Sequence, residues 1–127
     1  MKNKILLIVL DQFRTDCLNG AFSERFDMPH LRQLMGESVT FNRHYTVTSP
    51  CGPSRASLLT GLYAMNHRSI RNGTPLPQQH PTMASELRKA GYEPMLFGYT
   101  DVSADPQNRH PNDPDLKTYE GLAPGFS

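Results

Sequence analysis

One of the two cysteines of the chain lies in a stretch whose residues could do chemistry. The segment TSPCGPSRASLLTG, residues 48–61, sets Cys51 between prolines and places Arg55 four positions later. Pro53 suits the first turn of a helix and Gly61 suits its end, so Cys51 is expected at a helix N-terminus. The positive end of a helix and a nearby guanidinium favour a bound anion or a thiolate. The residues alone allow a structural thiol, a reactive thiolate, or a cysteine that is converted to another group.

Two common kinds of cysteine site do not fit this stretch. Cysteine phosphatases carry an arginine six positions after the cysteine, whereas residue 57 here is a serine. A zinc site would need further ligands, yet Cys17 is remote in sequence, no Cys-x-x-Cys pair is present, and the five histidines do not occur at ligand spacing. Cys17 is therefore interpreted as a structural residue with a free thiol.

The elements that would position the cysteine motif alternate between strands and helices. Residues 4–10, KILLIVL, form a continuous apolar run, which predicts a strand covered on both faces in a parallel sheet. Residues 38–47 and 93–99 are also expected to be extended, with helices starting near residues 29 and 83. This order predicts an α/β fold in which helices cover both faces of a mainly parallel sheet.

Ligands of open α/β sheets bind at the carboxyl ends of the strands. Asp11 and Gln12 follow the first strand, and Tyr99 and Thr100 end the last one, so these residues and the Cys51 loop are expected to converge at one edge. A carboxylate placed there is a suitable ligand for Ca²⁺ or Mg²⁺, which prefer oxygen donors. From the residues alone, the aspartate could equally cap a helix or pair with a neighbouring arginine.

Composition limits the classes of protein to which the chain can belong. Its 127 residues suit one domain with a single core. With 13 basic and 12 acidic side chains the net charge is +1, which gives no reason to expect binding to nucleic acid or to a membrane. The apolar run of residues 5–10 is too short for a signal peptide or a membrane span. Together with the low cysteine content, this indicates a cytoplasmic protein.

Two segments show no periodic pattern. Residues 62–81 are rich in Asn, Pro, His and Gly and are expected to form a loop, in which His67 and His80 are the histidines to test. Residues 101–127 carry several turn signals and no terminal element, which makes a long irregular stretch for a compact domain. We therefore expect the domain to continue beyond this chain, in residues that would cover the last segment.

The motifs resemble those of a known enzyme family. CGPSRASLLTG matches the Cys-x-Pro-x-Arg signature of the type I sulfatases, of the alkaline phosphatase superfamily, and ILLIVLDQ resembles their first strand with its metal-binding aspartate. GLYAMNHRSIRNGTPL and AGYEPMLFGYTD are most similar to the phosphonate monoester hydrolase branch. The resemblance implies that residues 1–127 are the N-terminal part of a three-layer α/β/α catalytic domain, with a strand and helix core over 1–100 and an irregular segment over 101–127.

The resemblance also assigns roles to individual residues. Cys51 is implied to be the precursor of Cα-formylglycine, made by a maturation enzyme, whose hydrated aldehyde acts as nucleophile and metal ligand. Asp11 matches a metal ligand, for Ca²⁺ first and for Mn²⁺ or Mg²⁺ as alternatives, and Arg55 matches the arginine that orients the formylglycine. Asn72 and Tyr99 match catalytic residues near the transferred group.

Positions that are expected to contact substrate separate the branches of the family. Gln12 stands where many sulfatases have a second Asp ligand, and a neutral Gln is the pattern of the phosphonate hydrolases. Asp101, expected with Thr100 to contact substrate, departs from both branches, because phosphonate hydrolases tend to have Thr there and sulfatases His. From residue types alone, Asn72 could instead simply form a turn, and Tyr99 could instead be a core residue at the end of a strand.

These features predict metal-dependent hydrolysis of small sulfate esters by a formylglycine derived from Cys51. Hydrolysis of phosphonate monoesters or phosphodiesters is the alternative within the family. A catalytically incomplete piece is the alternative from another class, because the remaining metal ligands of the family lie far downstream of the residues present here. The full-length protein is expected to form a homo-oligomer.

Overall fold

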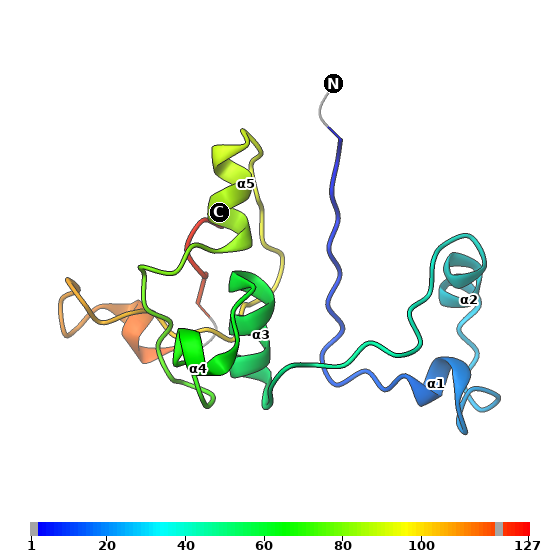
Figure 1. The fold of residues 1–127 in the computed structure, drawn as a ribbon. Coiled ribbons are helices and arrows are strands. Elements are labelled where there is room, and N and C mark those ends of the chain that lie inside the picture. The colour runs from blue at the N-terminus through cyan, green and yellow to red at the C-terminus, as the bar shows by residue number, and fades with distance from the viewer. Residues whose placement is uncertain (1–2, 119–120) are drawn as a thin grey trace. The chain divides into compact units, whose positions relative to one another are not determined.

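The chain divides into two compact units of unequal size. The computed structural model describes residues 3–118 and 121–127, which Figure 1 traces from blue to red. Unit 1 runs to His44, and unit 2 runs from Tyr45 to Ser127. The first apolar run therefore lies in unit 1, whereas the cysteine motif lies in unit 2.

The described part of unit 1 contains two short helices that one arginine links. Helix α1 spans Asp16–Asn19 and helix α2 spans Pro29–Gly36. The proline at the first position of α2 was predicted, because its fixed φ and missing N–H suit the start of a helix. Arg32 of α2 donates hydrogen bonds to the backbone carbonyls of Leu18 and Ser23. This side chain therefore ties α2 to the chain in and after α1.

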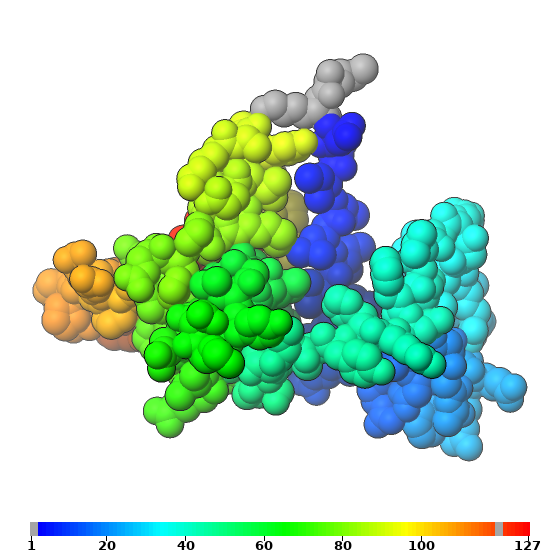
Figure 2. All heavy atoms as spheres, viewed as in Figure 1, coloured from blue at the N-terminus to red at the C-terminus, as the bar shows by residue number. Residues whose placement is uncertain are grey.

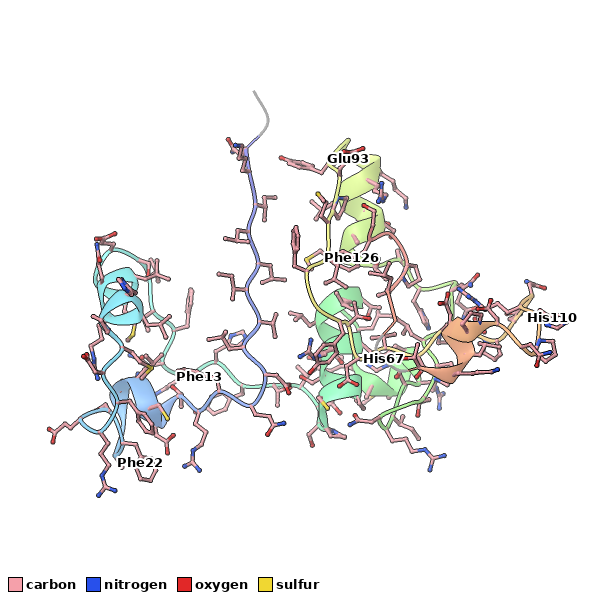
Figure 3. The ribbon with its side chains drawn as sticks, turned by 180° about the vertical axis from the view of Figure 1, so that it is seen from behind. Phe13, Phe22, His67, Glu93, His110 and Phe126 are labelled. Carbon is pink, nitrogen blue, oxygen red and sulfur yellow. The ribbon has the colours of Figure 1, made fainter. Side chains whose placement is uncertain are left out.

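Residues 4–10 are extended, but the strand that was predicted there is not formed within the described residues. The side chains from Ile5 to Leu10 are between 48% and 84% exposed. Figure 3 shows side chains projecting to both sides of this segment, and in Figure 2 it stands as a narrow blue column. A β-strand needs hydrogen bonds to a neighbouring strand, and an apolar pattern does not reveal whether that neighbour is present.

The strands predicted over 38–47 and 93–99 are likewise wrong for the part of the chain that the structure describes. Its β-type pairing is a single parallel bridge between Pro75 and Ser103, which no pattern in the sequence indicated. These segments have the residue types of strands, but ladder formation is a property of pairs of segments and not of one segment. The sheet of the predicted α/β fold is therefore not assembled by the described residues.

The described part of unit 2 is arranged around its longest helix. Helix α3 spans Cys51–Thr60, α4 spans Ala64–His67, α5 spans Met83–Lys89, and the 3₁₀ helix η1 spans Pro114–Lys117. Helix α3 contacts both α4 and α5 (Figure 1). The sequence predicts α3 and α5 but not α4, which lies in the segment expected to be a loop. No helix within residues 3–118 and 121–127 is long and apolar enough to cross a membrane.

The ends of α3 and α5 follow from local sequence. Gly61 ends α3 with a φ of 71°, in the left-handed region that glycine adopts without steric cost. Helix α5 begins with a capping box, in which the Thr82 hydroxyl accepts from the Ser85 N–H at 3.1 Å and the Ser85 hydroxyl accepts from the Thr82 N–H at 2.9 Å. Gly91 follows α5 with a φ of 79°, in the same left-handed region. Residues within one turn of each end therefore define both helices.

The core of unit 2 lies where α3 meets the C-terminal part of the chain. Ala56 and Leu59 of α3 pack in one buried apolar cluster with residues of three other segments, namely Leu76, Val102 and Ala123. Two partly buried residues, Met83 and Phe126, pack against the cluster, and Figure 3 labels the phenylalanine. Burial of apolar surface is the main source of stability here. The same helix that carries Cys51 at its start is therefore anchored in the core by its later turns.

The last segment of the chain is held by hydrogen bonds as well as by the core. The Thr82 hydroxyl at the start of α5 donates to the Pro124 carbonyl. The Leu96 N–H donates to the Ser127 carbonyl at 3.0 Å. The described residues of segment 101–127 are mostly irregular, as expected, but the segment also contains η1 and places Val102 and Ala123 in the core.

His67, which Figure 3 labels, ends α4 and contacts α3 inside unit 2. Its ring is fully buried, the Ser69 N–H donates to its Nδ1 at 3.0 Å, and its Nε2 lies 2.9 Å from the Ser57 hydroxyl oxygen in α3. Because Nδ1 accepts a hydrogen bond, the neutral ring carries its proton on Nε2 and donates it to Ser57. Burial lowers the pKa of His67, since a charged ring would lose its hydration. His67 is therefore a structural residue and not a ligand.

The burial of the His67 ring predicts that stability depends on pH. The folded state binds a proton at His67 less readily than the unfolded state, whose pKa is about 6.5. The contribution of the neutral His67 ring to the free energy of unfolding is complete above about pH 6.5. It is lost as the pH falls toward and through the lower pKa of the folded state, by up to about 1.4 kcal/mol per pH unit. Urea unfolding at about pH 7.5 and about pH 5.5 should show this loss, and His67→Gln should reduce it. The exposed His30, changed to Gln, is the control; an unchanged pH slope in the His67 variant would contradict this account.

Candidate functional site

Cys51 is the first residue of α3, as predicted, and its thiol is free and partly buried. The first turn of a helix has N–H groups without helical acceptors, and the positive end of the helix dipole lies there. Arg55 follows one turn later, and a spacing of four residues puts it on the same face of α3 as Cys51. A negatively charged group beside Cys51 is therefore favoured by both the helix and Arg55.

The side-chain amide of Asn72 joins the first two residues of α3. The Gly52 N–H donates to Oδ1 of Asn72 at 2.9 Å, and Nδ2 of Asn72 lies 3.1 Å from Sγ of Cys51. Because the Gly52 N–H can only donate, the amide oxygen must face it, and the NH₂ group must then face the sulfur. Asn72 therefore presents a hydrogen-bond donor to the atom at the end of the Cys51 side chain.

Asn72 also belongs to a turn, which the sequence had left as the alternative to a site role. The Thr74 N–H donates to the Arg71 carbonyl at 3.0 Å, and Gly73 has a φ of 77°. A left-handed glycine at the third position is typical of tight turns that carry asparagine beside it. The turn holds the backbone that carries Asn72, so the two interpretations are compatible.

The close approach of Asn72 to α3 depends on the missing side chain of Gly52. A Cβ atom on this residue would lie 3.0 Å from Oδ1 of Asn72, 3.3 Å from its Cα, and 3.1 Å from the backbone oxygen of Asp101. These separations are shorter than ordinary van der Waals contacts, so a larger residue would displace its neighbours. Sequence reasoning passed over Gly52, although a glycine between Cys51 and Pro53 is the signal that could have revealed the contact.

Arg55 contacts Tyr99 in two ways. Its Nη1 donates to the Tyr99 backbone carbonyl at 3.2 Å, and its guanidinium carbon lies 4.8 Å from the centroid of the Tyr99 ring. The second distance is within the range of cation–π attraction. The structure therefore joins the predicted site residues in two pairs, Cys51 with Asn72 and Arg55 with Tyr99, and α3 carries one member of each pair.

Thr100 and Asp101, which were predicted to contact substrate, are 3% and 4% exposed. The Thr100 hydroxyl donates to the Gly121 carbonyl at 2.6 Å, so it holds the chain in place. Asp101 has a φ of 55°, and within the described residues its buried Oδ1 has no hydrogen-bond partner. A buried carboxylate oxygen without a donor is costly, which makes Asp101 an unusual residue beside Gly52.

Asp11 and Gln12 lie in unit 1, where both are exposed and Nε2 of Gln12 is 3.4 Å from Oδ2 of Asp11. Their convergence with the Cys51 loop of unit 2 stays a prediction. Across residues 3–118 and 121–127, no three His, Cys, Asp or Glu side chains are grouped so that they could hold a metal ion. The Asp11 carboxylate has the oxygen donors that Ca²⁺, Mn²⁺ and Mg²⁺ accept, but the described residues do not form the expected metal site by themselves.

Two further hydroxyls of α3 are engaged in contacts that sequence reasoning missed. The Ser54 hydroxyl lies 3.0 Å from the Thr46 hydroxyl, and the Ser57 hydroxyl accepts from His67. Both contacts join α3 to neighbouring segments on either side of Arg55. The serine spacing offers a weak sequence signal for this role, whereas no signal identifies the partners.

Comparison with known proteins gives consistent matches. Residues 3–123 match the family model described as Sulfatase. The chain resembles a solved structure titled as a phosphonate monoester hydrolase from Silicibacter pomeroyi, with a TM-score of 0.96 and 59% identity over 99% of this chain and 25% of that one. The phosphonate monoester hydrolase of Agrobacterium radiobacter gives a TM-score of 0.84 and 49% identity over 92% of this chain and 23% of that one.

Curated sequences match in the same way. The multifunctional alkaline phosphatase superfamily protein PehA of Trinickia caryophylli is 42% identical, over 98% of this chain and 25% of its own length. An arylsulfatase of Clostridium perfringens is 37% identical, over 77% of this chain and 21% of its own length. The chain therefore spans about a quarter of the length of these relatives.

The geometry around Gly52 predicts that a single methyl group disturbs the site. In Gly52→Ala the new Cβ would displace the Asn72 amide and weaken its hydrogen bonds to Gly52 and Cys51. We expect a loss of about 1 to 3 kcal/mol in unfolding free energy, the usual cost of overpacking. Gly36→Ala is the matched control, because a Cβ at this other helical glycine meets nothing within 4 Å. Urea unfolding measures both variants, and equal effects would show that Gly52 is not sterically constrained.

Proposed function

The chain belongs to the sulfatase family, and from that membership we propose that it supplies the nucleophile region of a hydrolase for phosphonate monoesters and related phosphodiesters. The observation that carries the proposal is the Asn72 amide, which the Gly52 N–H holds and which donates toward the Cys51 sulfur. Hydrolysis of such esters needs a nucleophile surrounded by groups that stabilise negative charge on the transferred group. The N-terminus of α3, Asn72 and Arg55 are groups of this kind.

Cys51 is the residue proposed to be converted to formylglycine by a maturation enzyme. In that conversion the Cβ–S bond and one Cβ–H bond would be replaced by a C=O bond and the sulfur would leave as hydrogen sulfide. This is a two-electron oxidation, for which dioxygen would be the oxidant if a reductant in the maturation system supplied two further electrons and the second oxygen atom left as water. Once hydrated, the aldehyde supplies one hydroxyl as a nucleophile and a second that allows the aldehyde to re-form. The Asn72 NH₂ group, which faces Sγ before conversion, is placed to donate to an oxygen on the same carbon.

Arg55 and the helix N-terminus are proposed to hold the charged oxygens of the ester. The guanidinium presents positive charge and N–H donors in a planar fork that matches the oxygens of an anionic ester. The helix dipole acts in the same direction at Cys51, and the two effects add because Arg55 lies on the same face of α3. An anionic ester is therefore preferred over a neutral one of equal size.

Sulfate esters are the second candidate substrates, although the sequence alone placed them first. The family model and the arylsulfatase match support them. The identities of 59% and 49% to phosphonate monoester hydrolases, against 37% to the arylsulfatase, favour the phosphonate ester. Both substrates are tetrahedral anionic esters, so the same donors around Cys51 would serve either.

A divalent cation and the three-layer fold are proposed for the whole enzyme. The cation would be held by Asp11 and the converted Cys51 together with ligands outside the described residues, with Ca²⁺ as the first candidate and Mn²⁺ or Mg²⁺ as alternatives. It would supply positive charge at the transferred group. The extended, two-sided apolar segment of residues 4–10 has the residue pattern of a buried strand in such a sheet.

Mass spectrometry and parallel assays of the full-length enzyme, produced with a maturation enzyme, test the proposal. The peptide that contains Cys51 should be about 18 Da lighter than its unmodified form, which is the difference between thiol and aldehyde. The value of kcat/KM should be higher for a phosphonate monoester than for an aryl sulfate. Cys51→Ala cannot be converted and should lose about 1000-fold or more in activity. Full activity with an unmodified thiol would refute the proposal, and a preference for the aryl sulfate would establish the second candidate instead.

Asp101 is proposed to set the charge that the site accepts. Its backbone oxygen lies beside Gly52 at the start of α3, and its side chain is buried with an unpartnered oxygen. A carboxylate there opposes each additional negative charge on a substrate. Threonine, the residue expected in the phosphonate branch, is a poor probe because a β-branched side chain is strained at a φ of 55°. Asparagine keeps the shape and tolerates this backbone conformation.

Asp101→Asn should therefore change the preference for substrate charge. We expect the ratio of kcat/KM for a dianionic phosphate monoester to that for a monoanionic phosphonate monoester to rise by roughly 3- to 10-fold, because one unfavourable Coulomb interaction is removed. Steady-state kinetics with both substrates measure the ratio. Asp115→Asn, which makes the same charge change at an exposed residue of η1, should leave it unaltered. An unchanged ratio in the Asp101 variant would remove this residue from the site.

A further inference from the structure

The contact between Arg55 and Tyr99 joins residues that are far apart in sequence and close to Cys51. The ring centroid of Tyr99 lies 4.8 Å from the guanidinium carbon of Arg55, and the Tyr99 carbonyl accepts from Nη1 at 3.2 Å. Together they restrict the guanidinium both in direction, through the hydrogen bond, and in plane, through the ring face. A long arginine side chain without such contacts would sample many rotamers.

Tyr99 is itself held in place by its neighbours in the chain. The next residue, Thr100, is buried and its hydroxyl donates to the Gly121 carbonyl at 2.6 Å. Gly98 before it and Asp101 after it have φ values of 112° and 55°, so the backbone turns on both sides of Tyr99. The side chain of Tyr99 is 38% exposed and does not belong to the buried apolar cluster. Its ring therefore forms a fixed surface beside Arg55 and is not simply part of the core.

We infer that Tyr99 is a positioning residue, whose ring face and backbone carbonyl hold the Arg55 guanidinium in register with Cys51. The inference rests on the proposed function, in which Arg55 binds the charged oxygens of the ester. It assigns the effect of Tyr99 to its aromatic ring acting through Arg55, and not to a hydroxyl that touches the transferred group. Two properties follow: phenylalanine can replace Tyr99, and Tyr99 has no effect without Arg55.

Kinetics of the full-length, converted enzyme test both properties. Tyr99→Phe should retain kcat/KM within about 2-fold, whereas Tyr99→Leu should lose on the order of 10-fold, within the range of a cation–π contact. In an Arg55→Met background, Tyr99→Leu should cost less than about 2-fold, because the two residues act as one unit. Phe22→Leu is the matched control: it removes the ring from beneath Arg14 and Arg25, at 5.5 and 5.7 Å in unit 1, and should leave kcat/KM unchanged.

Three results would overturn the inference. An equal loss in Tyr99→Phe and Tyr99→Leu would assign the effect to the hydroxyl. Full additivity of Tyr99→Leu with Arg55→Met would show that Tyr99 acts without the arginine. A fall in thermal unfolding midpoint that accounts for the lost activity of Tyr99→Leu would show a structural role alone.

A readout that does not need turnover separates this inference from the proposed function. The side-chain NMR signals of Arg55 should be shifted by the ring in the native protein and in Tyr99→Phe, and should return toward ordinary values in Tyr99→Leu. If the enzyme hydrolyses no ester but this pattern is seen, the proposed function fails and the contact stands. If the enzyme is active but the Arg55 signals are the same in all three proteins, the positioning role fails and the function stands.

Discussion

The hydrogen bond from the Gly52 N–H to the Asn72 amide oxygen is the interaction on which the site depends. It uses a donor that the first turn of a helix leaves without a helical acceptor, so it costs no hydrogen bond elsewhere in α3. It also decides which end of the amide faces Cys51, since the oxygen is already committed. The glycine is needed because any side chain at this position would occupy the space of Asn72. The Gly52 N–H therefore fixes the orientation of the Asn72 amide, and through it the hydrogen-bond donor that faces Cys51.

Helix α3 connects this site to the stability of unit 2. Its first residue is chemically available, whereas Ala56 and Leu59 are buried in the apolar cluster. Electrostatic preference for anions is local to its N-terminus, which agrees with a net charge of +1 for the whole chain. A site that relies on one helix end and one arginine needs that helix to be rigid. The packing of the later turns of α3 provides that rigidity.

Short-range signals in the sequence predicted the longer helices α2, α3 and α5 but not the shorter α1, α4 and η1, and contacts between distant segments could not be predicted. Pro29, Gly61 and Gly91 mark helix ends because the conformations they adopt are decided within one turn. The strand segments were not formed in the described residues, since their pairing depends on neighbours that an apolar pattern does not specify. The resemblance to the family predicted site roles for Cys51, Arg55, Asn72 and Tyr99, but not which of these residues are in contact. Asn72 reaches Cys51 across 21 positions, and Arg55 reaches Tyr99 across 44, beyond any local rule.

The direction of the hydrogen bond between His67 and Ser57 has a consequence for how unit 2 should be classified. At 2.9 Å the pair has the separation of a nucleophile and its general base in a serine hydrolase. Here the Nε2–H of the imidazole donates a hydrogen bond to the Ser57 hydroxyl, because Nδ1 accepts the Ser69 N–H. A base that already donates cannot remove the hydroxyl proton, and its buried ring resists the charge that such a step would create. Ser57 therefore has a structural role in α3. An assignment based on the Ser–His distance alone would wrongly give the chemistry of this unit to Ser57 and not to Cys51.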